Sequence, residues 1–125
     1  MKIGILGAGS VGTALAVGWA KADHHVKLGV RDPHAPKVAK VLSEAGANAT
    51  AGTVSEAVEF GTVVVLATPW SAVEEVIAEA GDLSGKVLFD CTNPLKPNLT
   101  GLELGHTTSA GERVQKLAPS ARVVK

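Results

Sequence analysis

Residues 2–12, KIGILGAGSVG, decide the fold. The apolar segment Lys2–Leu6 predicts a short strand, and the pattern at residues 10–22 predicts an amphipathic helix. Between them lies a G-x-G-x-x-G turn, which in this context is typical of a site for the pyrophosphate of a dinucleotide. The turn supplies six candidate contact residues: Gly7, Ala8, Gly9, Ser10, Val11 and Gly12.

Each glycine of this turn has a separate physical role. Gly7 allows a sharp turn out of the strand, Gly9 lets backbone amides approach the phosphates, and Gly12 lets the helix pack closely on the sheet. The first N–H groups of the helix have no acceptor within it, and the positive end of the helix dipole favours an anion.

The composition fits one domain, residues 1–125, with an aliphatic core. A chain of this length buries roughly two thirds of the surface that it exposes when unfolded. Aromatic residues make up only 3% and tyrosine is absent, so Val, Leu, Ile and Ala must fill the core. Such a core is typical of a parallel sheet covered by helices.

Charge and cysteine content exclude several classes of protein. The 12 basic and 12 acidic residues balance, which argues against a nucleic-acid partner. The single cysteine, Cys91, excludes an internal disulfide framework. Apolar runs are far shorter than a membrane span, so we expect a cytoplasmic protein without membrane contact.

Strand and helix patterns alternate from end to end. Strands are predicted at residues 2–6, 25–30, 47–51, 62–67, 86–90 and 121–125. Helices are predicted at residues 10–22, 32–46, 53–60, 71–81 and 109–119, and a loop at residues 92–108. The alternation predicts a doubly wound α/β parallel sheet in three αβα layers, a Rossmann fold, with about six strands in the order 3-2-1-4-5-6.

Three of the helices carry start signals. Asp32 followed by Pro33 predicts an N-cap and a first helical residue. TVSE at residues 53–56 and SAVE at residues 71–74 are two predicted capping boxes.

Four unusual loops are expected at one edge of the sheet, outside the carboxyl ends of the strands, where ligands bind in this fold. They follow Leu6, the strand ending before Arg31, the strand ending at Ala67, and the strand ending before Cys91. This topology, more than any single motif, predicts a binding site.

The end of the second strand decides the cofactor. An acid there suits the ribose hydroxyls of NAD, whereas a cation suits the 2′-phosphate of NADP. Asp32 is expected to cap a helix, while Arg31 has a planar fork suited to phosphate, with His34 and Lys37 adding positive charge nearby. The sequence favours NADP over NAD, the alternative being that Arg31 is only a solvated loop residue.

The remaining polar residues assign no catalytic group. Trp70 lies near the nicotinamide half or packs at a helix entry, and Asn93 reaches the nicotinamide or belongs to a plain loop. Cys91 is interpreted as a small packing residue. No metal-ligand spacing and no nucleophile–base pair is recognisable.

Several segments resemble the N-terminal domain of the deazaflavin (coenzyme F-420)-dependent NADP reductases. The similar segments are GAGSVG at 7–12, GVRDP at 29–33, ATPW at 67–70 and DCTNPL at 90–95, together with residues 105–112 and 121–125. Val30 stands where that family usually has a serine, which removes one hydrogen bond to the 2′-phosphate.

The resemblance implies a set of NADP(H) contacts. It places the pyrophosphate at Ala8, Gly9, Ser10 and Val11, the 2′-phosphate at Arg31, and the nicotinamide side near the backbone of Ala67, Thr68, Pro69, Cys91, Thr92 and Asn93. It further implies direct hydride transfer to a deazaflavin or flavin acceptor. A smaller helical domain that closes the site and forms a homodimer is expected to be absent from residues 1–125.

The resulting hypothesis is an NADP-dependent oxidoreductase, or its cofactor-binding domain, that exchanges hydride between NADPH and a small-molecule acceptor of the deazaflavin or flavin type. Hydride transfer needs juxtaposed rings more than an acid or base, in agreement with the unassigned catalytic residues. The alternative is a non-catalytic NAD(P)-binding or redox-sensing module. A methyltransferase is disfavoured because its second strand should end in an acid.

Overall fold

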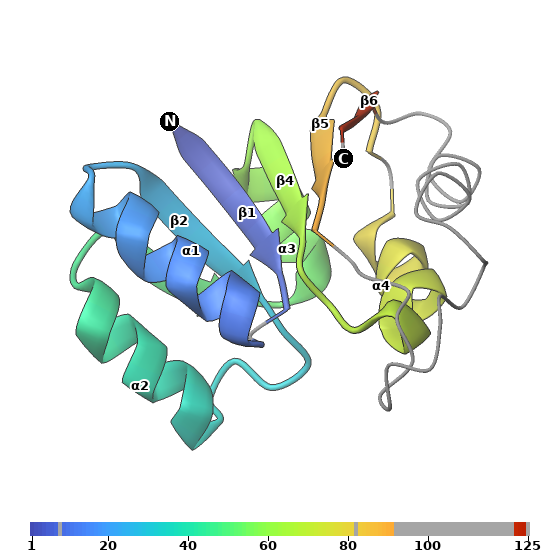
Figure 1. Ribbon diagram of the computed structural model, residues 1–125. Coiled ribbons are helices and arrows are strands. Elements are labelled where there is room, and N and C mark those ends of the chain that lie inside the picture. Colours follow the sequence, from blue (N-terminus) through green and yellow to red (C-terminus); the bar gives the residue numbers. More distant parts are fainter. Residues whose placement is uncertain (8, 82, 92–121, 125) are drawn as a thin grey trace, which may run out of the picture.

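Six parallel strands form one sheet in the order β3-β2-β1-β4-β5-β6, as the sequence predicts. The computed structural model describes residues 1–7, 9–81, 83–91 and 122–124 (Figure 1). The strands are β1 (Lys2–Leu6), β2 (His25–Gly29), β3 (Ala49–Gly52), β4 (Val63–Leu66), β5 (Val87–Asp90) and β6 (Arg122–Val124). The helices are α1 (Ser10–Lys21), α2 (Pro36–Ala45), α3 (Val54–Phe60), α4 (Val73–Ala80) and the short 3-10 turn η1 (Trp70–Ala72).

Helices cover both faces of the sheet, which confirms the three-layer Rossmann architecture (Figure 1). On one face, Ile3 and Ile5 of β1 pack in a core cluster with residues of α1 and α2. On the other face, Leu6 of β1 packs with residues of α3 and α4. Because successive side chains of a strand point to opposite faces, the central strand contributes to both cores and its apolar run is continuous.

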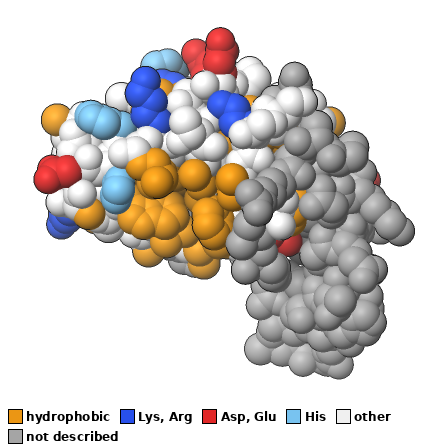
Figure 2. Space-filling view, turned by 90° about the horizontal axis from the view of Figure 1, so that it is seen from above, with side chains coloured by type: hydrophobic (Ala, Val, Ile, Leu, Met, Phe, Trp, Pro, Cys, Tyr) orange, Lys and Arg blue, Asp and Glu red, His pale blue; other side chains and the backbone are white. Residues whose placement is uncertain are grey.

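The edge at which the strands begin is seen in Figure 2. Lys, Arg, Asp, Glu and His side chains are interspersed there, beside a group of hydrophobic side chains. Among the described residues, this face therefore carries both signs of charge. The described helices include none that is long and apolar enough to cross a membrane.

The start of α2 differs from the prediction. The helix begins at Pro36, not Pro33, and Ala35 is its N-cap. Asp32 instead closes a local turn, because its Oδ1 accepts from the His34 N–H at 3.0 Å and its carbonyl from the Ala35 N–H at 3.1 Å. Aspartate has two ways to satisfy nearby backbone donors, and here the turn is preferred over the helix cap.

The two predicted capping boxes have different outcomes. In α3 the Glu56 N–H donates to Thr53 Oγ1 and the Thr53 N–H donates to Glu56 Oε1, as predicted. The backbone hydrogen bond from Thr53 lowers the pKa of the Glu56 carboxyl, so its contribution to stability is lost as the pH falls through that lowered pKa. The second box is wrong, because a 3-10 turn leads into α4 and its N-cap, Ala72, has no capping side chain.

Other boundaries agree within about two residues, including the last strand, β6. The predicted loop at 92–108 and the helix at 109–119 lie outside the described residues, as do Ala8, Thr92 and Asn93.

A test of this packing uses Gly4, which faces the carbonyl of Ala57 in α3. A Cβ at position 4 would lie 2.2 Å from that oxygen, so we expect Gly4→Ala to lower the free energy of unfolding by at least about 1–3 kcal/mol. Gly18→Ala is the matched control, because a Cβ there meets nothing within 4 Å and an alanine inside α1 should add roughly 0.5–1 kcal/mol. Chemical denaturation measures both; equal changes would contradict the close approach of α3 to β1.

Candidate functional site

The turn from β1 to α1 has the tight geometry that its glycines predict. Gly7 has φ +115°, and its N–H donates to the carbonyl of Gly29 at 2.9 Å. A Cβ at Gly7 would lie 2.8 Å from the carbonyl oxygen of Ala67. At Gly12 a Cβ would lie 3.0 Å from the Gly7 carbonyl oxygen and 3.3 Å from Ala67 Cβ. The first turn of α1 is therefore held against the ends of β1 and β4.

Within the described part of the chain, the space next to Gly9 remains open. A Cβ at this position would find its nearest atom, the Ala67 carbonyl oxygen, at 4.0 Å. Gly9 is the N-cap of α1, so no side chain caps the helix, and its first turn contains no acid. The N–H groups of this turn and the positive helix end are thus available to an anion, with room for it to approach.

A cavity of about 330 Å³ lies at the same edge of the sheet, within the size range of small-molecule sites. It brings together the β1 turn, the end of β2, the loop after β4, and the exposed side of α4. Its lining residues are Gly7, Gly29, Val30, Arg31, Val54, Thr68, Pro69, Ala72, Glu75, Val76 and Glu79. Five of the predicted cofactor residues are therefore gathered here: Gly7, Val30, Arg31, Thr68 and Pro69.

The other predicted residues lie around this cavity or outside the described part. Ala67 is buried and packs against the glycine turn. Cys91 is exposed directly after β5, and its N–H donates to the Leu66 carbonyl at 2.9 Å. Val11 is half exposed on α1. The sequence favours a small packing residue at Cys91, but its exposure places it outside the described core.

Thr68 supplies a hydroxyl that has no hydrogen-bond partner among the residues that the structure describes. Its residue is 9% exposed, and its Oγ1 is buried without a hydrogen-bond partner while the residue lines the cavity. A buried hydroxyl without a partner is costly, and native structures retain such groups mainly where a ligand or water completes them. Thr68 is thus a candidate ligand contact.

Arg31 is paired across the cavity. Its Nη2 donates to Glu75 Oε1, and the two side chains are 72% and 54% exposed. Arg31 therefore has a partner that the sequence did not predict, an acid from α4 that engages its guanidinium. Sequence analysis missed Glu75, although residues 72, 75, 76 and 79 recur at helical spacing and form the face of α4 that lines the cavity.

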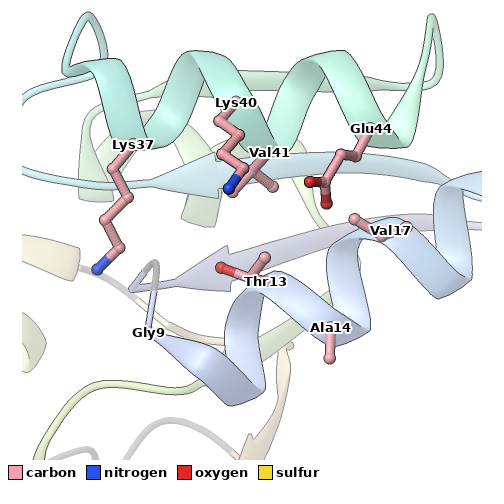
Figure 3. A pocket seen from close by; sticks show the side chains of 8 residues that line it. All are labelled: Gly9, Thr13, Ala14, Val17, Lys37, Lys40, Val41 and Glu44. Atoms are coloured by element: carbon pink, nitrogen blue, oxygen red, sulfur yellow. The ribbon is translucent and has the colours of Figure 1, made fainter.

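A second groove, of about 530 Å³, lies between α1 and α2 (Figure 3). Gly9 and Thr13 line its α1 side, and the side chains of Lys37 and Lys40 extend toward it from α2. Lys37 points toward the Gly9 end. The groove touches the glycine turn but not the end of β2, so Lys37 is separate from the cavity that holds Arg31.

Within the part of the chain that the structure describes, no three His, Cys, Asp or Glu side chains are grouped as metal ligands. The site is built from backbone amides, one guanidinium, two carboxylates and one buried hydroxyl. The amides and the guanidinium suit recognition of a phosphorylated ligand, whereas the two carboxylates oppose it.

Comparison with known proteins identifies the family. The model of the family described as "NADP oxidoreductase coenzyme F420-dependent" matches residues 2–94. The chain belongs to this family. This match confirms the resemblance that the sequence segments indicate. No curated protein matches the chain.

Solved structures show the same fold. A candidate F420-dependent NADP reductase from Arthrobacter sp. FB24 aligns with a TM-score of 0.86 at 31% identity, over 98% of this chain and 60% of that one. Hypothetical protein SMa0349 from Sinorhizobium meliloti aligns with a TM-score of 0.78 at 28% identity, over 98% and 58%. A reductive aminase from Aspergillus terreus shares the fold at 24% identity and a TM-score of 0.73, over 98% and 38%. The chain therefore spans about 60% of the first relative's length.

The effect of the unpaired Thr68 hydroxyl on stability can be tested by substitution. Thr68→Val removes a buried oxygen that has no partner, so we expect the free energy of unfolding to stay unchanged or to rise by up to about 1 kcal/mol. Thr62→Val is the control, because Thr62 Oγ1 donates to the Lys2 carbonyl at 3.3 Å and its loss should cost about 0.5 kcal/mol. Urea denaturation compares the two; a larger loss at Thr68 would mean that its hydroxyl is satisfied in the folded protein.

Proposed function

We propose that this chain is the NADP(H)-binding domain of an oxidoreductase that exchanges hydride between NADPH and a deazaflavin or flavin acceptor. The observation that carries the proposal is the convergence of an open helix N-terminus, a cation and an orphan hydroxyl on one sheet edge, in a chain that belongs to this family.

The pyrophosphate is assigned to the turn at Gly9. The N–H groups of the first turn of α1 (Ser10, Val11 and Gly12) would donate to its oxygens, and the open space beside Gly9 admits them. The tight packing of Gly7 and Gly12 fixes these amides in advance, so little ordering is needed on binding.

The adenosine half is assigned to the cavity between the end of β2 and α4. Val30 and Val76 offer apolar surface to a base, and Arg31 offers its fork to a 2′-phosphate. Asp32 is engaged in its own turn, so the acid that would favour NAD at this position is already occupied. The absence of the family's usual serine, replaced by Val30, leaves the 2′-phosphate more dependent on Arg31.

The nicotinamide half is assigned to the loop after β4 and the chain after β5. The backbone near Ala67, Pro69 and Cys91 lies beyond the carboxyl ends of these two neighbouring strands. When bound, the dihydronicotinamide supplies a hydride for the acceptor. The residues of this chain would orient its ring and leave one side open to that acceptor, which depends on positioning more than on an acid or base.

The solved relatives are longer than this chain. We therefore propose that a further helical domain completes the acceptor side and contributes to a homodimer in the whole protein, which we expect to be cytoplasmic.

The cofactor is tested by titration with NADPH and NADH. Arg31→Ala should weaken the binding of NADPH by roughly 1–3 kcal/mol, the scale of a charge-assisted contact, and leave the binding of NADH nearly unchanged. Lys37→Ala is the matched control, because this lysine lines the α1–α2 groove instead of the cavity and its loss should spare the preference for NADPH. Calorimetry measures both dissociation constants; equal weak binding of the two nucleotides by the unmodified protein would reject the role of Arg31.

The hydride acceptor is tested by turnover. The protein, in its whole form, should oxidise NADPH when an oxidised 8-hydroxy-5-deazaflavin is added, with FMN as the comparison acceptor, followed by absorbance of both chromophores. Tight NADPH binding without turnover on either acceptor would instead support the binding or redox-sensing module.

A further inference from the structure

We propose that Glu75 is a specificity-determining residue of the adenosine cavity, where its carboxylate competes with the 2′-phosphate of NADP for the guanidinium of Arg31. This inference rests on the proposed function, because it concerns which nucleotide the same cavity prefers.

Arg31 and Glu75 come from different elements and meet at the cavity. Arg31 follows β2, whereas Glu75 lies in the first turn of α4, 44 residues later in the sequence. Both line the 330 Å³ cavity, and the hydrogen bond from Arg31 Nη2 to Glu75 Oε1 joins them across it. A group that binds Arg31 from within the cavity therefore meets a guanidinium already engaged by a carboxylate.

The charges around the cavity also act differently on the two nucleotides. Among the described residues, the charged side chains that line the cavity are Arg31, Glu75 and Glu79, one cation and two carboxylates. A phosphate monoester adds close to two further negative charges at neutral pH. The neutral 2′-hydroxyl of NADH adds none. Repulsion from Glu75, and the loss of its bond to Arg31, therefore weaken the binding of NADPH but not the binding of NADH.

The ion pair between Arg31 and Glu75 is weak enough to be displaced. The two side chains are 72% and 54% exposed, so their ion pair is largely solvated. Exposed pairs contribute little, whereas a guanidinium–phosphate contact is frequently bidentate and stronger. The 2′-phosphate can thus displace Glu75, and the carboxylate reduces the preference for NADPH without abolishing it.

The experiment compares Glu75→Gln with Glu79→Gln. Both variants remove one negative charge from the same cavity and the same helix, but only Glu75 is bonded to Arg31. Titrated with NADPH and NADH, Glu75→Gln should bind NADPH about two- to five-fold more tightly, the range given by the strength of an exposed ion pair, with NADH unchanged. Glu79→Gln should give a smaller gain. Thermal unfolding checks that both variants fold.

A second variant pair tests whether the effect passes through Arg31. In an Arg31→Ala background, Glu75→Gln should improve NADPH binding clearly less than in the unmodified protein, because only the direct repulsion between the carboxylate and the phosphate is then relieved. The gain from Glu75→Gln should also shrink between about 0.05 and 1 M salt, as screening weakens the competing pair.

The outcomes separate this inference from the proposed function. If the unmodified protein binds neither nucleotide, the proposed function fails. If it binds NADPH but Glu75→Gln changes nothing, or changes NADPH and NADH equally, only the role of Glu75 is rejected. A gain that is equally large without Arg31, or that Glu79→Gln matches, also overturns the competition.

Discussion

The close approach of β1, β4 and α1 at the glycine turn is the constraint on which the rest of the structure depends. Gly7 and Gly12 both lie against Ala67, with no room for a side chain between them. This contact fixes where α1 begins relative to the sheet edge. The helix starts there without a capping side chain, so its first amides lie at the same edge of the sheet as the loop after β4.

The second consequence of this constraint concerns α4. The chain leaves β4 through Ala67, which packs against the glycine turn, and Thr68, which lines the cavity. It then enters α4 through a 3-10 turn without a polar N-cap. The helix is therefore positioned mainly by its apolar stripe, Val73, Ile77 and Ala80, which packs in the core. Its neighbouring face carries Glu75 to the cavity, so the core packing of α4 sets the electrostatics of the site.

The fold could be predicted from sequence because its signals are local and repeated. Buried parallel strands appear in the sequence as apolar runs, and the buried residues of α2 and α4 recur at helical spacing. Helix starts were less certain. Asp32–Pro33 and Ala35–Pro36 are competing start signals only three residues apart, and the Asp32 side chain stabilises a turn instead. Such competition depends on small free-energy differences that one sequence does not resolve.

The site could be predicted in part, and for a different reason. Parallel topology alone brings Gly7, Arg31 and Thr68 to one edge, since the carboxyl ends of the strands must meet there. The contact between Arg31 and Glu75 depends instead on the rotation of α4 about its axis, which tertiary packing sets. The sequence therefore identified the cation but not the acid that faces it.

That distinction bears on how cofactor preference arises in this domain. A cation at the end of β2 is necessary for a 2′-phosphate but does not by itself define the preference, because its availability depends on every carboxylate within reach. A buried Arg–Glu pair would hold the arginine too firmly, since breaking it leaves an uncompensated charge. An exposed pair such as that between Arg31 and Glu75 costs little to break, so a stronger anion can displace its carboxylate. Under the proposed competition, the preference follows from the balance between two anions for one guanidinium, and the rotation of α4 sets one side of that balance.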